Sequence, residues 1–251
     1  MGGLITMLVC GCIATLVWLA REYRYGDVVL TVEADGVRMG PPSRPGPSIS
    51  YHAIGAFRMS LIGQAMLVIG RDRRVLMRVP LALNDFDSAV CQLVPRWIAS
   101  GDAPPVHESF DATLFAPLRV LGAVEIAAGL TLALFPSEEY GLGAGAALIV
   151  LGMLHALSYF RANTERVDIG PERVTIAANL GTLEIPREKL IGVYLERVYT
   201  GVGVHELQLR LVQMDGDSIL IRPPQGIDPL ALFVSLERIR ERWERDGRTS
   251  N

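Results

Sequence analysis

Lysine is almost absent from this sequence, in which Lys189 is the only lysine among 24 basic residues. The net charge of −3 and the isoelectric point near 5.8 argue against a general nucleic-acid-binding protein, which normally has a basic face. Charged residues are also scarce, at 20% of the chain against the usual ~25%, while half of the residues are hydrophobic. This composition favours a membrane protein with polar segments.

Cysteine and catalytic motifs are equally sparse. Two of the three cysteines lie in an apolar run near the N-terminus, and Cys91 lies in a predicted helix, so no disulfide or metal pattern arises. His52, His107 and His205 are scattered, and the sequence contains no H-E-x-x-H, C-x-x-C, nucleophile elbow or P-loop. We therefore predict a protein that is not an enzyme, with no catalytic residue, cofactor or metal site.

Three apolar runs occupy residues 2–20, 112–135 and 142–160. A helical bilayer crossing takes about 17–25 residues, so each run predicts a transmembrane helix. The acidic, breaker-rich segment 136–141 joins the second and third runs into a helical hairpin. A signal peptide is the alternative for the first run, but the missing basic start and cleavage site favour a retained anchor.

Arginine flanks these runs on one side only. Arg21 and Arg24 follow the first run, and Arg119 and Arg161 lie at the ends of the hairpin away from its loop. The positive-inside rule then predicts a multi-pass protein of the bacterial inner (cytoplasmic) membrane, with its N-terminus outside and both polar segments in the cytoplasm.

The two polar segments repeat one another. Four apolar residues of the first, spaced 4, 3 and 4, predict one stripe of a helix, and four of the second have the same spacing. The two stripes are Phe86, Val90, Leu93, Trp97 and Leu232, Leu236, Ile239, Trp243. Asn84 and Asp228 are the predicted N-caps of these helices, and Pro95 predicts a kink or an early end.

Short alternating strands precede each helix. Leu207, Leu209 and Leu211 alternate with polar residues, and Asp215 with Gly216 predicts the hairpin turn that follows. Each copy is therefore predicted as β-β-β-β-β-α, a small antiparallel barrel or sandwich closed by an amphipathic helix. The predicted domains are an anchor (1–25), a first repeat (26–111), a transmembrane hairpin (112–160) and a second repeat (161–251).

The run from Ile185 to Val193 resembles the I-P-x-x-x-I-x-x-V strand of bacterial pleckstrin-homology (PH) domains. The first copy keeps Ile49, Ile54 and Phe57 at this spacing but has Ser50 in place of the proline. The resemblance implies a membrane α plus α+β fold, with three transmembrane helices and two PH-like β-barrels. It also implies a membrane-tethered, non-catalytic role, often in the assembly of other membrane proteins.

Six side chains are candidate site residues. Glu125 and His155 are polar groups within the second and third apolar runs, close enough in depth for the hairpin to bring them together. The other four, a dense basic run, are candidates for contact with anionic headgroups: Arg71, Arg73, Arg74 and Arg78. Each group also has a structural alternative. Glu125 and His155 would form a hydrogen bond that locks the helical hairpin, and the four arginines would belong to a solvated turn.

These features together predict an interaction or assembly module that presents two cytoplasmic PH-like domains to other membrane proteins. The alternative is a small transport or proton-handling component that uses Glu125 and His155. The predicted partners are the lipid bilayer and other membrane proteins, with no nucleic acid, and self-association into a homo-oligomer is left open.

Overall fold

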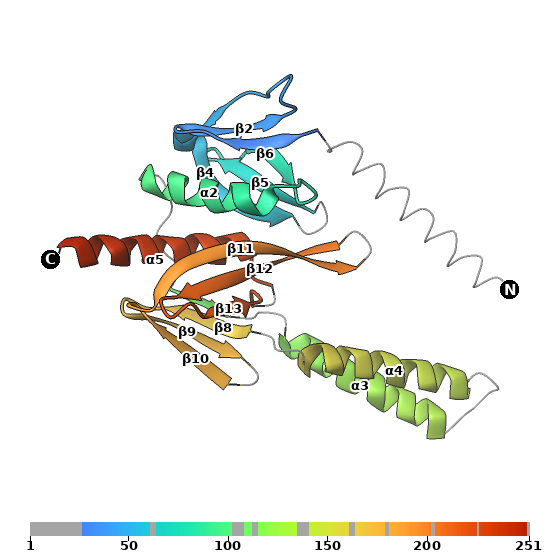
Figure 1. Cartoon of the computed structure of the whole chain (residues 1–251). Helices are drawn as coiled ribbons and strands as arrows, with labels where there is room; N and C mark the ends of the chain where they lie inside the picture. Colours follow the sequence, from blue (N-terminus) through green and yellow to red (C-terminus); the bar gives the residue numbers. More distant parts are fainter. Residues whose placement is uncertain are drawn as a thin grey trace. The chain divides into compact units, whose positions relative to one another are not determined.

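The computed structural model describes residues 27–60, 64–101, 108–111, 115–134, 141–160, 164–178, 181–201, 204–224 and 226–249 (Figure 1). The chain forms two compact units. The first contains the described residues within 1–107, 187–220 and 228–251, and the second contains those within 108–186 and 221–227. Segments from both ends of the chain therefore build the first unit.

The described residues of the first unit form three-stranded antiparallel sheets and two α-helices. One sheet has the order β1-β2-β3, the next β4-β5-β6, and the last β11-β12-β13. Their bounds are Val29–Val32 (β1), Gly36–Gly40 (β2), Ile49–Ser50 (β3), Ile54–Ser60 (β4), Ala65–Gly70 (β5), Val75–Pro80 (β6), Leu190–Gly201 (β11), Val204–Gln213 (β12) and Ser218–Ile221 (β13). The predicted turn before β13 is confirmed, since Gly216 has a φ of +88°.

Helix α2 (Phe86–Ala99) buries the apolar stripe that the sequence predicted. Trp97 is fully buried, donates its indole N–H to the carbonyl of Ile54 at 3.3 Å, and meets the edge of Phe57 at a ring separation of 4.9 Å. The predicted early end at Pro95 is wrong, because the helix continues to Ala99. The N-cap is Asp85, one residue after the predicted position.

Helix α5 (Pro229–Thr249) contacts α2, β4, β11 and β12. Its predicted stripe is also buried, and Asp228 caps the helix by accepting the N–H of Leu230 at 3.0 Å. The second carboxylate oxygen of Asp228 accepts the N–H of Met59, in β4, at 2.8 Å. One side chain therefore starts α5 and fixes it to a strand far away in the sequence.

The second unit contains one sheet of order β10-β9-β8-β7 and a helical hairpin. The strands are β7 (Ser109–Asp111), β8 (Thr164–Ile169), β9 (Arg173–Ala178) and β10 (Gly181–Pro186), and all of their pairings are antiparallel. The helices are α3 (Phe115–Leu134) and α4 (Gly141–Phe160), which lie side by side. Val167, Ile169, Val174 and Ile176 are buried apolar residues of its two central strands, β8 and β9.

The predicted PH-like barrels are not present in the described residues. A barrel needs hydrogen bonding that continues around all of its strands, but each predicted copy contains separate open sheets. In the first copy a 3-10 turn at Tyr51–Ala53 interrupts the chain between β3 and β4. In the second, residues before and after β10 contribute to different sheets.

The three predicted transmembrane spans are also corrected. The first apolar run lies outside the described residues, and the other two form α3 and α4, but no helix in the described part is long and apolar enough to cross a bilayer. Helix α3 includes Arg119 and Glu125. An apolar run indicates that its side chains avoid water. It does not show whether lipid or other protein side chains surround them. The predicted multi-pass inner-membrane localisation, which depended on these spans, is therefore wrong.

We predict that Asp228→Ala lowers the free energy of unfolding by about 2–4 kcal/mol, because it removes a helix cap and leaves the Met59 N–H without its acceptor. Asp228→Asn retains one oxygen and should recover part of this loss. Urea denaturation followed by circular dichroism measures both. The control is Asp215→Ala, which removes an exposed side chain that accepts the Asp217 N–H at 3.2 Å. Equal losses in the two alanine variants would contradict the linking role of Asp228.

Candidate interaction surfaces

Helices α3 and α4 cross at two glycines. A β-carbon on Gly129 would lie 2.7 Å from the carbonyl oxygen of Gly145, and one on Gly145 would lie 2.7 Å from the carbonyl oxygen of Gly129. Both distances are too short for any other residue, so the glycines let the two backbones approach closely. The same contacts place Ala133 beside Gly145 and Ile149 beside Gly129, which makes the pair antiparallel.

Large apolar side chains remain exposed around this crossing. The exposed fraction is 71% for Leu134, 56% for Val124 and 56% for Val150. Leu130, Leu151 and Met153 are also exposed. We call these six residues the hairpin surface. On each helix the exposed apolar side chains lie on the face away from the crossing, and large exposed apolar patches mark binding surfaces more often than scattered single side chains do.

The two predicted polar groups of the hairpin lie on its two helices. Glu125 is half-buried on α3, one turn before Gly129, toward the half of α4 that contains His155. The side chain of His155 lies outside the described residues. Their pairing therefore stays a prediction.

The four predicted basic residues gather on the hairpin of β5 and β6. Arg71, Arg73 and Arg74 occupy its turn, and Arg78 is exposed on β6. Arg74 pairs with Asp72 at 3.5 Å, with both side chains mostly exposed, as expected for a solvated turn. Their contact with anionic headgroups stays a prediction.

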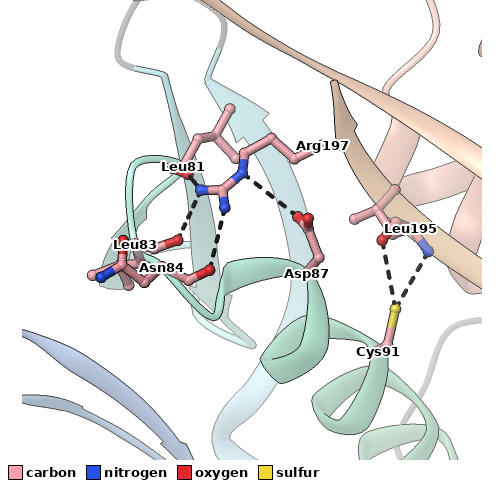
Figure 2. A network of polar contacts seen from close by, with 7 residues as sticks. All are labelled: Leu81, Leu83, Asn84, Asp87, Cys91, Leu195 and Arg197. Carbon is pink, nitrogen blue, oxygen red and sulfur yellow. Dashed lines mark hydrogen bonds and ion pairs between the residues drawn. The ribbon is translucent and has the colours of Figure 1, made fainter. Parts of the chain in front are cut away.

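A network around Arg197 joins β11 to the segment that leads into α2 (Figure 2). The guanidinium donates to the carbonyl oxygens of Leu81, Leu83 (2.7 Å) and Asn84 (3.3 Å), and lies 3.9 Å from the carboxylate of Asp87. The Arg197 side chain is only 17% exposed. Its charge is thus removed from water and matched by carbonyl dipoles and one carboxylate, which fixes β11 to the N-terminal segment.

Cys91 lies at the same junction. The N–H of Leu195 lies 3.3 Å from its sulfur, and burial raises the pKa of the thiol to about 11. A thiol with this pKa stays protonated at neutral pH and is a poor nucleophile. The position of Cys91 therefore favours packing over chemistry.

Three arginines on α5 form a separate basic feature. Arg238, Arg242 and Arg245 line one cavity together with Asp246. They are not among the six candidate site residues that the sequence suggested. Their spacing of 4 and 3 residues places them on one face of the helix. This spacing is the sequence signal that distinguishes them from the other charged residues of α5.

Arg197 was also missed by sequence reasoning. It follows Val193 and Leu195 at alternate positions of a strand, so the period of two places it on the buried face. A charged residue at a core-facing position is a signal for a buried polar contact, although the sequence does not identify the three carbonyl groups that it meets.

We predict that Gly145→Ala loosens the α3–α4 crossing, because the new methyl group meets backbone atoms that must shift. Hydrogen exchange of α3 and α4, followed by mass spectrometry, should accelerate by about tenfold. Gly143→Ala is the matched control, since a β-carbon there meets nothing within 4 Å. It should slow exchange or leave it unchanged, because alanine favours the helix over glycine. Faster exchange in both variants would contradict the close crossing.

For the junction, Arg197→Ala should lower the free energy of unfolding by about 2–4 kcal/mol, since three carbonyls lose their charged donor. The matched control is Arg210→Ala, on the neighbouring strand, where Arg210 pairs with Glu196 at 2.7 Å and is 45% exposed. That substitution should cost less than about 1 kcal/mol. Chemical denaturation measures the free energy of unfolding of both variants. Similar losses of stability in the two would contradict a special role of the Arg197 network.

Comparison with protein-family models and with curated proteins finds no match to this chain. The resemblance to bacterial PH-domain membrane proteins is therefore not supported, and it is also overturned by the open sheets and by the absence of a span-forming helix from the described residues. The pattern that suggested it, a proline-started strand with apolar residues at fixed spacing, is common to many antiparallel strands.

Proposed function

We propose that this chain is a non-enzymatic interaction module that assembles through the hairpin surface of α3 and α4. The single observation that carries the proposal is the group of exposed apolar side chains on both helices. Because the crossing itself uses Gly129 and Gly145, the larger side chains are left to point outward. They form a surface with no partner among the described residues.

The occupant to which we commit is the same hairpin of a second copy. Leu130 and Leu134 are four residues apart on α3, and Val150 and Met153 are three apart on α4, so each helix presents an apolar ridge. Two helical hairpins that place such ridges together form a four-helix bundle. A two-fold arrangement uses the same surface twice, so one chain supplies both sides of the interface.

The energetics suit a dimer of moderate affinity. Each of the six side chains is already partly buried, so completing their burial in two copies yields on the order of 10 kcal/mol. Association costs about 4–15 kcal/mol in lost freedom of motion. Charge contributes little to this balance, because Glu125 is the one ionisable residue among the side chains described on α3 and α4.

The alternative of proton handling by Glu125 and His155 receives no support from a specific observation. It depended on membrane-spanning helices, which the described part of the chain does not contain. We therefore do not propose it.

Sedimentation velocity of the full chain in aqueous buffer tests the proposal. We expect a concentration-dependent dimer, and the double variant Leu130→Glu, Val150→Glu should weaken dimerisation at least tenfold because it buries carboxylates in an apolar interface. The matched control is Met214→Glu, at another exposed apolar residue, which lies in the turn after β12. It should dimerise like the parent chain.

Two outcomes would contradict the proposal. One is a chain that stays monomeric at every concentration. The other is a chain whose hairpin is protected from hydrogen exchange by phosphatidylcholine vesicles and not by a second copy, since the apolar surface would then serve lipid rather than protein.

A further inference from the structure

The charges of helix α5 separate into two groups on its surface. Arg240 contacts Glu237 at 2.9 Å and also pairs with Glu244, so one group consists of opposite charges that neutralise each other. The other group consists of Arg238, Arg242 and Arg245, which line the same cavity. We call these three residues the arginine row.

The cavity has a volume of about 310 Å³, and its described lining contains three guanidinium groups and one carboxylate, that of Asp246. Glu241 lies on the same face of the helix, 3.7 Å from Arg245. Positive charge is thus concentrated at one concave place on the helix.

Electrostatics at the inner end of the row indicate an excess of positive charge. Burial, followed by the charges of Arg242 and Arg245, lowers the pKa of Arg238, and Glu241 offsets only part of this effect. A guanidinium in such surroundings gains most from an added negative charge, because like charges are close and water is partly excluded.

A role in stabilising the end of the helix does not account for the whole row. Cations stabilise a helix within its last turn, and α5 ends at Thr249. This effect can explain Arg245, but Arg238 lies about three turns before the end. The backbone beneath the row is also fixed, since Arg187 donates to the carbonyl of Trp243 at 2.8 Å and the Trp243 side chain is buried.

We infer that the arginine row is a binding site for a phosphate group carried by a small ligand. The guanidinium presents a planar fork of N–H donors that matches phosphate oxygens in pairs, and three forks around one cavity supply both charge and direction. No bond is made or broken in this role. The site is independent of the hairpin surface, which belongs to the other unit.

Isothermal titration calorimetry of the full chain with sodium pyrophosphate, at low and high salt, tests the inference. We expect saturable binding that weakens as salt rises. Arg242→Gln removes an exposed member of the row and should weaken binding about tenfold without changing the unfolding temperature. Arg74→Gln is the matched control, since it removes another exposed arginine, from the β5–β6 turn, and its affinity should equal that of the parent chain.

A second arm separates two sources of phosphate. Flotation with phosphatidylcholine vesicles, with and without phosphatidic acid, reports recognition of a lipid headgroup. A soluble ligand is supported if Arg242→Gln loses pyrophosphate binding and the parent chain floats with neither kind of vesicle. No pyrophosphate binding by the parent chain, equal weakening in Arg74→Gln, or a response to phosphatidic acid vesicles alone would overturn the inference.

Discussion

The first unit depends on the hydrogen-bond partners of one guanidinium that is mostly removed from water. Arg197 comes from β11, late in the chain, and its carbonyl acceptors lie just before α2. A charge that is removed from water costs several kcal/mol unless all of its donors find partners. The network is therefore stable only when β11 and the start of α2 are together, and this requirement couples two segments that are more than a hundred residues apart in the sequence. Asp228 imposes a similar condition on α5 and β4, because its two oxygens serve both elements.

These two links explain why the compact units differ from the repeats that the sequence suggests. Each repeat contains two groups of three consecutive strands followed by a helix, in the same order, although β7 from the end of the first repeat joins the sheet of β8, β9 and β10. The contacts follow another division, because β11, β12 and α5 complete the unit that begins with β1. Local propensity determines which segments become strands and helices, whereas buried polar contacts between distant segments determine which of them pack together.

Sequence reasoning performed best where a regular period was the signal. The two apolar stripes were predicted residue by residue, because burial on one face of a helix repeats every three or four positions. The N-cap at Asp228 was also predicted from local sequence. The predicted N-cap at Asn84 was wrong by one position, and the carbonyl of Asn84 accepts a hydrogen bond from Arg197 instead.

The predicted barrels were wrong because the connection between sheets depends on the turn at Tyr51–Ala53, which has no strong residue signature. The spans failed because hydropathy measures a preference against water and not the identity of the surroundings. Of the candidate sites, the contact of the four basic residues with headgroups stays a prediction. The arginine row was not recognised, because glutamates lie between its members in the sequence.

The two proposed surfaces follow one principle. Each lies where the described residues leave a local requirement, for burial or for charge balance, only partly met. On α3 and α4 the requirement is burial, because close contact through glycine turns the large apolar side chains outward. On α5 it is charge balance, because the cavity at the arginine row is lined by three guanidinium groups and one carboxylate among the described residues. An apolar surface is satisfied by another apolar surface at any ionic strength, whereas an excess of guanidinium groups is satisfied by an anion and loses strength as salt rises. The two surfaces can therefore be distinguished by salt, because only binding at the arginine row weakens as the salt concentration rises.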